Sequence, residues 1–475
     1  MLVTHLDSPN YTPRALPGTI WVGNAATWQV FIGPDMKGLP SFKHGVHPPE
    51  NKDITSGIAS KRFPFPREVI LPLSQHIGTP AKALVKAGDH VERGDVIAEA
   101  AGFISSTVHA TAAGTVKSIE LWPHPNGSMA PSIRIDVDPS SSQMRRNRMV
   151  PRWRDVPEED LSKEIAKAGI VGLGGAAFPS HVKLCPPKDQ PVELLLINGC
   201  ECEPYLTSDH RVMLEQPDKV YEGIRIALRA LGITRCVIGI ENNKPDAIEM
   251  MRITKPDDLD VTVQPLTVKY PQGAEKMLIK AVMGREVPSG ALPSAIGAMV
   301  QNVATAANVA AVFETGHPLI ERIITVTGRG IRKPGNWKIP FGTKLRDVIE
   351  HCGGLTEDAA EIVFGGPMMG QGQANLDVPI LKANGGILVL SKDECKRQNI
   401  MPCIRCGKCL DACPVFLNPQ LMGDLAKAER YEEMVEEAHL NDCMLCGSCS
   451  YVCPSNIPLS QLFVMSKTQL RKLAS

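Results

Sequence analysis

The pattern of hydrophobic and polar residues divides this chain into segments of different character. Between residues 68 and 138, short β-type apolar runs are broken by glycine turns, as around Gly88 and Gly94. From about 155 to 320, apolar runs alternate with amphipathic helical stretches. Frequent short strands with turn signals indicate an all-β unit, whereas alternating strands and helices are typical of an α/β layer structure. The pattern therefore predicts several domains of different class.

Individual elements follow from the same pattern. In the α/β segment we expect strands at 192–197, 236–240 and 261–268, and helices at 158–168, 219–231 and 273–283. A smaller β-turn-β-α unit follows, with strands at 323–327 and 337–339 around a Pro334-Gly335 turn and a helix at 345–352. Beyond residue 392 the stretch 417–440 is amphipathic and predicts helices. Residues 1–67 are rich in Pro, Gly and His, which favours an extended arm.

Composition and charge exclude several classes of function. A chain of 475 residues is too long for one hydrophobic core, and 43% hydrophobic with 21% charged residues is typical of globular protein. Lys+Arg and Asp+Glu both number 51, so nothing indicates binding to nucleic acid or lipid headgroups. The uncharged stretch 287–313 contains Pro, Gln and Asn among small residues. We expect it to be a buried soluble segment, with no direct membrane span.

Eight of the 14 cysteines form two copies of one spacing, C-x2-C-x2-C-x3-C-P, which is the only internal repeat. Such a loop supplies three ligands to one cubane cluster, while its fourth cysteine binds the other cluster. Cluster 1 is therefore assigned to Cys403, Cys406, Cys409 and Cys453. Cluster 2 is assigned to Cys443, Cys446, Cys449 and Cys413. Structural zinc sites use pairs of ligands instead, and the other six cysteines show no disulfide-type spacing.

The segment Gly172-Leu173-Gly174-Gly175-Ala176-Ala177 matches G-x-G-x-x-A, the dinucleotide-binding fingerprint. That fingerprint requires a preceding strand, and the residues before this loop have a helical pattern. We therefore reject an ordinary Rossmann site. A glycine cluster can still present backbone N–H groups to a phosphate, and the alternative is a turn packed against the sheet.

Four segments in order resemble the FMN domain of the NADH-oxidising subunit of respiratory complex I. They are its glycine loop at 169–183, its acidic loop at 198–204, its Tyr-x-x-Gly segment at 270–276 and its Asn-Val helix at 301–309. Residues 68–138 resemble the barrel-sandwich domains of biotinyl and lipoyl carriers, but no lysine lies near the hairpin tip at Phe103, so this unit is interpreted as structural. The complete architecture resembles the RnfC family, the NADH-facing subunits of ion-translocating Rnf electron transport complexes.

The resemblance implies a multidomain α/β protein. Its predicted parts are an N-terminal arm at 1–67, a barrel-sandwich hybrid β domain at 68–140, an FMN/NADH-binding α/β domain at 150–321, a β-grasp (SLBB) domain at 322–392 and an α-helical ferredoxin domain with two [4Fe–4S] clusters at 393–475.

It also implies roles for the residues of the glycine loop. Gly172, Gly174 and Gly175 would line the FMN phosphate. Lys183 would offset the phosphate charge, and Phe178 would stack on the nucleotide.

The other implied cofactor contacts come from three later segments. Asn198 and Asn302 would hydrogen-bond the polar edges of the flavin, and Glu203 and Glu275 would lie near the isoalloxazine and nicotinamide. Tyr270 belongs to the same cofactor-binding set. The chain departs from the complex I pattern by placing Val171 and Leu173 where arginines stand, and Cys200, Ala274 and Lys276 at acidic positions. These departures concern the NADH contacts.

The implied function is electron transfer. NADH gives up two electrons at once and each cluster accepts one, so a flavin must stand between them, and no general acid or base is predicted. The resemblance implies an NADH dehydrogenase component of a translocating NAD:ferredoxin oxidoreductase, peripheral on the cytoplasmic side of the bacterial cytoplasmic membrane. Its partners would be other Rnf subunits, including an iron–sulfur subunit, and indirectly ferredoxin. The alternatives are a cobalamin reductase, in which the carrier-like barrel follows the clusters, and a flavin-free iron–sulfur protein.

Overall fold

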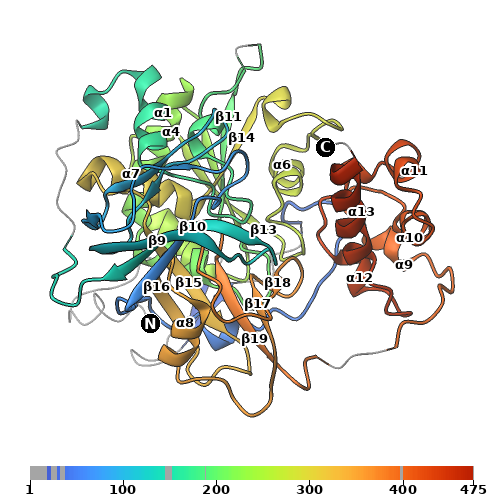
Figure 1. Cartoon of the computed structure of the whole chain (residues 1–475). Helices are drawn as coiled ribbons and strands as arrows, with labels where there is room; N and C mark the ends of the chain where they lie inside the picture. Colours follow the sequence, from blue (N-terminus) through green and yellow to red (C-terminus); the bar gives the residue numbers. More distant parts are fainter. Residues whose placement is uncertain are drawn as a thin grey trace.

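A computed structural model describes residues 19–22, 29–32, 37–144, 152–187, 189–395 and 399–473. The predicted arm therefore lies partly outside the described residues. Figure 1 shows a large body of sheets and helices, with a helical lobe beside it that carries α9 (Lys408–Ala412) and α13 (Leu459–Leu473). Among the helices of the described ranges, none has the length and apolar content needed to cross a bilayer.

The predicted barrel segment contains two small sheets. One has the strand order β4-β10-β9-β6 and the other β5-β7-β8. Their bounds are β4 (Glu68–Pro72), β5 (Lys82–Ala83), β6 (His90–Val91), β7 (Val96–Glu99), β8 (Val108–His109), β9 (Gly114–Pro123) and β10 (Met129–Val137). Along β10 the side chains of Ile133 and Ile135 are fully buried, whereas the next residue, Asp136, is exposed, as strand alternation requires. The hairpin between β7 and β8 carries the exposed Phe103, as predicted for the tip.

The α/β unit is built on a parallel sheet with the order β13-β12-β11-β14. These strands are β11 (Leu194–Asn198), β12 (Cys236–Glu241), β13 (Val261–Leu266) and β14 (Ala298–Asn302). The helices around them are α1 (Glu158–Lys167), α2 (Ser180–Lys183), α3 (Ser208–Glu215), α4 (Pro217–Leu231), α5 (Pro245–Ile253), α6 (Glu275–Met283) and α7 (Val303–Thr315). The three strands and three helices expected here are confirmed, with ends that differ by at most two residues.

The expectation that all of 287–313 is buried is wrong for its first part. Pro288, Ser289 and Gly290 are exposed, and Leu292 is 62% exposed. These residues form a loop rich in Pro, Ser and Gly, which supplies few apolar side chains for a core. The second part forms β14 and α7, and most of it is buried because small side chains let the helix pack closely on α4.

The next unit joins a mixed sheet to one helix. The strand order is β18-β17-β19-β15-β16-β3. Its elements are β15 (Glu321–Thr327), β16 (Gly335–Pro340), α8 (Leu345–His351), β17 (Ala359–Phe364), β18 (Gln371–Gly372) and β19 (Gly386–Ser391). The edge strand β3 (Lys61–Arg62) comes from the predicted arm and pairs in parallel with β16. The last part of the arm is therefore a strand of this sheet, which its polar sequence did not reveal.

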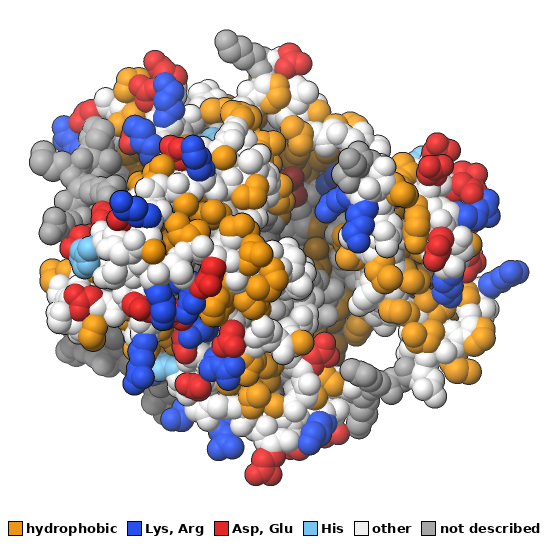
Figure 2. All heavy atoms as spheres, in the orientation of Figure 1, with side chains coloured by type: hydrophobic (Ala, Val, Ile, Leu, Met, Phe, Trp, Pro, Cys, Tyr) orange, Lys and Arg blue, Asp and Glu red, His pale blue; other side chains and the backbone are white. Residues whose placement is uncertain are grey.

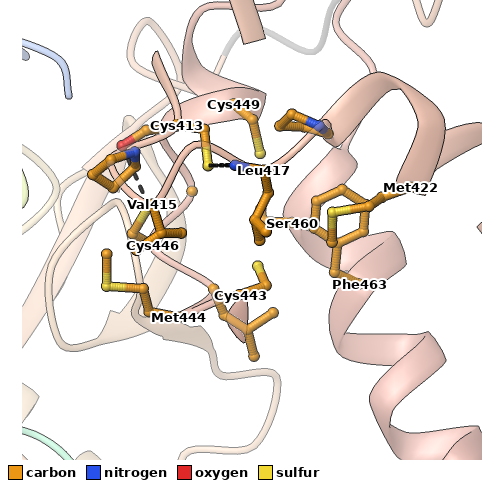
Figure 3. A pocket seen from close by; sticks show the side chains of 15 residues that line it. Cys413, Val415, Leu417, Met422, Cys443, Met444, Cys446, Cys449, Ser460 and Phe463 are labelled. Carbon is orange, nitrogen blue, oxygen red and sulfur yellow. Dashed lines mark hydrogen bonds between the residues drawn. The ribbon is translucent and has the colours of Figure 1, made fainter. Parts of the chain in front are cut away.

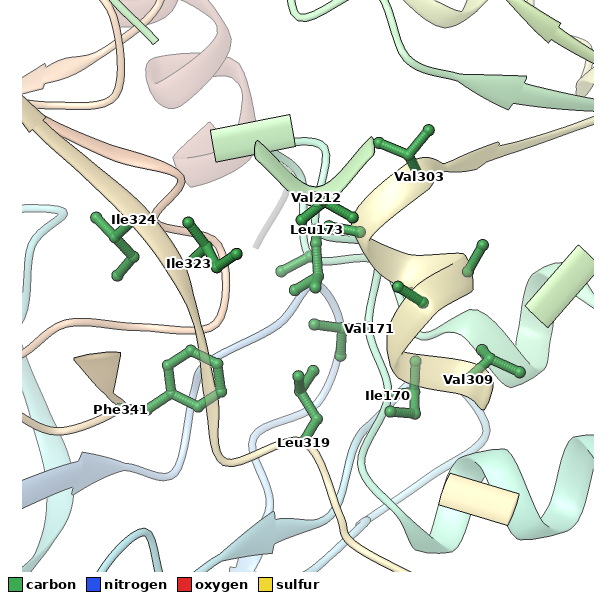
Figure 4. Close-up of a cluster of buried hydrophobic side chains, with 14 of the residues drawn as sticks. Ile170, Val171, Leu173, Val212, Val303, Val309, Leu319, Ile323, Ile324 and Phe341 are labelled. Atoms are coloured by element: carbon green, nitrogen blue, oxygen red, sulfur yellow. The ribbon is translucent and has the colours of Figure 1, made fainter. Parts of the chain in front are cut away.

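A shared core supports the residues that lead into the glycine loop. Figure 4 shows Ile170, Val171 and Leu173 among apolar side chains of α7, such as Val309, and near Phe341. All five side chains are buried. Burial of each large apolar side chain contributes roughly 1.5–3 kcal/mol. The loop thus begins on a rigid base where two units meet.

The helical lobe has its own small core. It contains α9, α10 (Pro419–Lys427), α11 (Tyr431–Glu436), α12 (Ser448–Tyr451) and α13. The predicted helical stretch 417–440 is confirmed as α10 and α11. Met422, Met434, Leu440 and Phe463 are buried together in this lobe. Figure 2 shows a groove between the lobe and the larger body on the face that is drawn.

Candidate functional site

The four cysteines predicted for cluster 2 line one pocket. Cys413 comes from the first cysteine run, and Cys443, Cys446 and Cys449 come from the second. Figure 3 shows their sulfur atoms directed into a common space, with Phe463 of α13 on one side. The two runs therefore exchange their fourth cysteines in space, as the crossed spacing predicts.

The four cysteines predicted for cluster 1 also lie together, nearer the surface. The thiols of Cys403, Cys406 and Cys453 are the charged neighbours of Cys409, and together with burial they raise the pKa of the Cys409 thiol. Cys403 and Cys406 are exposed, whereas Cys413 and Cys449 of the other set are buried. Cluster 1 would thus face solvent and cluster 2 the protein interior.

The chemistry of these thiols fits iron–sulfur clusters. Burial raises the pKa of Cys443 to about 11, and burial and neighbouring thiols raise the pKa of Cys449. A cationic cluster core offsets the cost of four thiolates so close together. Within the described ranges, no three His, Cys, Asp or Glu side chains come close enough to hold one metal ion. A mononuclear zinc site would require that convergence, whereas a cubane holds its thiolates farther apart. The ligand assignment itself stays a prediction.

The glycine loop is held at its second residue and free at its tip. The N–H of Leu173 donates to Thr305 Oγ1 (2.9 Å), and its carbonyl accepts from Arg322 Nη2 (2.9 Å). Gly174 and Gly175 are exposed. Their N–H groups have no hydrogen-bond partner among the residues that the structure describes.

Both tip glycines suit a phosphate site. A Cβ at Gly174 would lie 3.3 Å from Asn302 Cβ, and Gly175 has a φ of +138°, a conformation that other residues rarely adopt. Free backbone N–H groups in such a turn form an anion-binding concavity. The loop therefore fits the phosphate of FMN, and Gly172 closes its base by donating its N–H to Phe178 O (2.8 Å).

Lys183 and Glu275, both predicted to bind cofactor, form an ion pair with 2.7 Å between Nζ and Oε2. Lys183 Nζ also donates to Val300 O (3.2 Å). Both side chains are partly exposed, so the pair lies at the rim of the site. The cation expected to offset the phosphate charge is thus already partly neutralised by Glu275.

The amides of Asn302 and Asn198 already make contacts inside the protein. Asn302 Oδ1 caps α7 by accepting from the N–H groups of Ala304 (2.9 Å) and Thr305 (3.2 Å). Its Nδ2 donates to Asp209 Oδ2 (2.6 Å). A side-chain amide has two N–H donors, so one remains on Asn302. This residue therefore offers a flavin one donor and no acceptor.

Asn198 shows the same arrangement. Its Nδ2 donates to Gly273 O (2.8 Å), and its Oδ1 accepts from Cys200 N–H (3.1 Å). Asn198 and Asn302 end neighbouring parallel strands, β11 and β14. Ligands of open α/β sheets bind at this carboxyl edge. The two remaining amide N–H groups thus lie where a flavin ring is expected.

Glu203 and Tyr270 are used differently from the prediction. Glu203 accepts hydrogen bonds from the backbone N–H groups of Met368 (3.2 Å) and Met369 (2.9 Å), and burial raises its pKa to about 7. Tyr270 OH donates to Cys446 O (2.8 Å). Their contacts therefore connect the α/β unit to the β-grasp loop and to the cluster 2 loop.

Several residues that shape the site escaped the sequence reasoning. Buried Asp209 holds Asn302, and burial together with nearby Glu201 raises the pKa of Asp209 to about 7. Glu201 accepts from the N–H groups of Asp209 (2.8 Å) and His210 (3.0 Å) at the start of α3. Its place in the acidic loop was a usable signal. Arg322 lies on a distant strand, and no local pattern marked it.

The arm contributes one more such residue. The buried ammonium of Lys52 donates to the carbonyls of Glu201 (2.8 Å), Glu203 (2.8 Å) and Leu206 (2.5 Å). Burial lowers the pKa of Lys52. Three carbonyls on one cation fix the path of the acidic loop, which explains how Glu203 is directed away from the glycine loop.

Four family models match the chain. They describe an RnfC barrel sandwich hybrid domain at 40–140, a Nuo51 FMN-binding domain at 165–311, an SLBB domain at 323–372 and a 4Fe-4S dicluster domain at 399–457. The match at 40–140 begins within the predicted arm.

Relatives match over most of the chain. The RnfC-type component of the proton-translocating ferredoxin:NAD(+) oxidoreductase complex of Clostridium ljungdahlii is 43% identical over 404 residues, covering 85% of this chain and 88% of that protein. The corresponding component of the Na(+)-translocating complex of Acetobacterium woodii is 41% identical over 393 residues, covering 83% and 89%. The solved NAD+-reducing [NiFe]-hydrogenase in the H2-reduced state is 19% identical, with a TM-score of 0.47 over 68% of this chain and 61% of that one.

Proposed function

The chain belongs to the RnfC family of ion-translocating oxidoreductase subunits, and on this premise we propose that it passes electrons between NAD(H), FMN and two [4Fe–4S] clusters. The observation that carries the proposal is the hydrogen bond from Tyr270 OH to Cys446 O, at 2.8 Å. It joins the FMN-domain fold directly to the loop of a predicted cluster ligand. Flavin and cluster chemistry would therefore be neighbours in one chain.

The residues of the site divide the work of holding the cofactors. The free N–H groups of Gly174 and Gly175 would bind the FMN phosphate, with Lys183 nearby. The remaining amide donors of Asn198 and Asn302 would bind acceptors of the ring. When bound, FMN supplies the exchange between two-electron and one-electron transfer. No side chain is required to move a proton in this scheme.

The proposed setting is a membrane complex. The relatives are named as subunits of ferredoxin:NAD(+) oxidoreductase complexes that translocate protons or Na+. We propose the same assembly for this chain, with an iron–sulfur subunit among its partners and ferredoxin as the indirect redox partner. Its place would be peripheral, on the cytoplasmic side of the bacterial cytoplasmic membrane. The proposal includes the predicted domain boundaries.

The cobalamin reductase alternative does not fit the domain order. The barrel model matches at 40–140 and the FMN model at 165–311, so the barrel precedes the flavin domain. The flavin-free alternative is tested by cofactor content. After anaerobic purification and reconstitution, we expect about one FMN and about eight irons per chain, and NADH oxidation with an artificial acceptor. Eight irons with no FMN after reconstitution would establish the flavin-free alternative instead.

A further inference from the structure

Two side chains from outside the helical lobe bind the backbone of predicted cluster 2 ligands. Tyr270 OH donates to Cys446 O at 2.8 Å. His44 Nδ1 lies 3.1 Å from Cys413 O. A carbonyl oxygen only accepts, so Nδ1 must carry the imidazole proton in this contact. Each of the two cysteine runs that form the pocket is thus held by one external donor.

These two donors are built into one piece of structure. The N–H of Val46 donates to Tyr270 O and the N–H of Tyr270 to Val46 O, both at 2.9 Å, and Gly45 N–H donates to Ala412 O at 3.3 Å. Val46, Tyr270 and Ala412 form a buried apolar cluster. The arm and the Tyr-x-x-Gly segment therefore meet the lobe together.

Gly45 shows how close this approach is. A Cβ at Gly45 would lie 2.6 Å from Tyr270 O, and the residue has a φ of +81°. Only glycine fits both the space and the backbone conformation. On the other side, the ring of His44 contacts Phe416, with 4.4 Å between centroids. The imidazole is therefore fixed between an aromatic ring and a ligand carbonyl.

The environment of cluster 1 is different. Its loop is tied by Met401 N–H to Ser455 O and by Ser455 Oγ to Pro402 O, both at 2.9 Å and both inside the lobe. Cys403 and Cys406 are exposed. In the part of the chain that the structure describes, no hydrogen bond from outside the lobe to a predicted cluster 1 ligand is found.

We propose that Tyr270 and His44 are positioning residues that set the reduction potential of cluster 2 and leave that of cluster 1 unchanged. The inference rests on the proposed function. Reduction adds negative charge to a cluster, and the positive ends of the O–H and N–H dipoles point toward the ligand backbone. Hydrogen bonding and exclusion of solvent both tune cluster potentials. The two donors therefore stabilise the reduced form and raise the potential.

The test is an EPR-monitored redox titration of the reconstituted full chain, with dithionite as reductant in the presence of mediators. Tyr270→Phe removes one hydroxyl and keeps the ring that packs on Val46. We expect the reduced-to-oxidised ratio of cluster 2 at a fixed potential to fall severalfold, where tenfold corresponds to 59 mV for one electron. The ratio for cluster 1 should not change. The matched control is Tyr451→Phe, which removes an exposed hydroxyl from the same lobe and should shift neither cluster.

His44 provides the second arm of the test. His44→Ala should lower the potential of cluster 2, and His44→Asn should restore it, because the Asn amide places an N–H donor near the position of Nδ1. If Tyr270→Phe and His44→Ala both leave cluster 2 at its original potential, the inference is wrong. Because dithionite supplies the electrons, this result is separate from the proposed function, which fails if NADH does not reduce the unmodified protein. If His44→Ala does not load clusters, Tyr270→Phe alone decides.

Discussion

Lys183 and Glu275 form an ion pair across the site, although the resemblance assigned them to different parts of the bound cofactors. Nζ and Oε2 are 2.7 Å apart. The pair joins α2, which follows the glycine loop, to the first residue of α6. A phosphate that binds near the glycine loop would compete with Glu275 for the same ammonium group. The net charge offered to the phosphate is therefore set by two residues.

This pairing leads to a paired prediction. Lys183→Ala should weaken FMN binding by about tenfold, or about 1.4 kcal/mol, because a cation near the phosphate is lost. Glu275→Gln should leave FMN binding equal or tighter, because Lys183 is released from its partner. The measurement is FMN affinity by fluorescence quenching, with iron content as a control for both variants. Unchanged FMN affinity in Lys183→Ala would show that Lys183 does not face the phosphate.

The conformation of the glycine loop gives a second prediction. Gly175→Ala should reduce FMN retention, because a side chain at a φ of +138° costs roughly 1–3 kcal/mol and moves the N–H groups at the tip. Gly57→Ala is the matched control, since nothing lies within 4 Å of a Cβ there and its φ is not in the left-handed range. Flavin content after gel filtration measures the effect. Equal flavin in both variants would contradict the phosphate role of the loop.

The crossed arrangement of cysteines gives a third prediction. Cys413→Ala should abolish the EPR signal of cluster 2 although Cys413 belongs to the first run, and Cys406→Ala should abolish that of cluster 1. Both variants should keep FMN. Cys185→Ala removes an exposed thiol outside the runs and should keep both signals. Loss of cluster 1 in Cys413→Ala would show that each run binds its own cluster.

The cap of α7 gives a stability prediction. Asn302→Ala removes an N-cap, which costs about 1 kcal/mol, and leaves buried Asp209 without its donor, which adds roughly 1–3 kcal/mol. Asn418→Ala removes the N-cap of α10, whose side chain accepts from Leu421 N–H at 3.1 Å, and should cost only the cap. The drop in thermal midpoint of the cofactor-free protein should therefore be larger for Asn302→Ala. Equal drops would contradict the role of the Asn302–Asp209 contact.

The raised pKa of Glu203 predicts a pH dependence of stability. Burial raises this pKa from 4.5 to about 7. The folded state therefore holds a proton that the unfolded state has lost between these values, and stability falls as the pH rises from 4.5 to 7, by up to roughly 3 kcal/mol. Glu203→Gln should flatten this part of the profile and be relatively more stable at pH 8. Denaturant unfolding at several pH values measures it, and an unchanged profile would contradict the shift.

Part of this structure was readable from local patterns. Apolar runs located β11, β12 and β13, because a strand buried on both faces is continuously hydrophobic. Strand β14 was missed, because its run of Ala, Met, Val, Gln and Asn follows a loop of similar small residues. The crossed cysteines came together as their spacing indicated, because the cluster geometry dictates that spacing.

The contacts that complete the site could not be read in this way. Lys52 reaches the acidic loop from about 150 positions away in sequence, and His44 reaches Cys413 from 369 positions away. Both contacts depend on how the arm crosses the folded domains. Tyr270 was correctly singled out, but its hydroxyl is turned to Cys446 by the bridge with Val46, which no local pattern encodes.

The most direct test of electron transfer within this chain is an anaerobic titration of the reconstituted protein with NADH, followed by flavin absorbance and EPR together. The account predicts that NADH bleaches the flavin and that signals from both clusters appear in the same preparation. A protein that contains its full FMN and iron, yet shows neither bleaching nor a cluster signal with NADH, would contradict it.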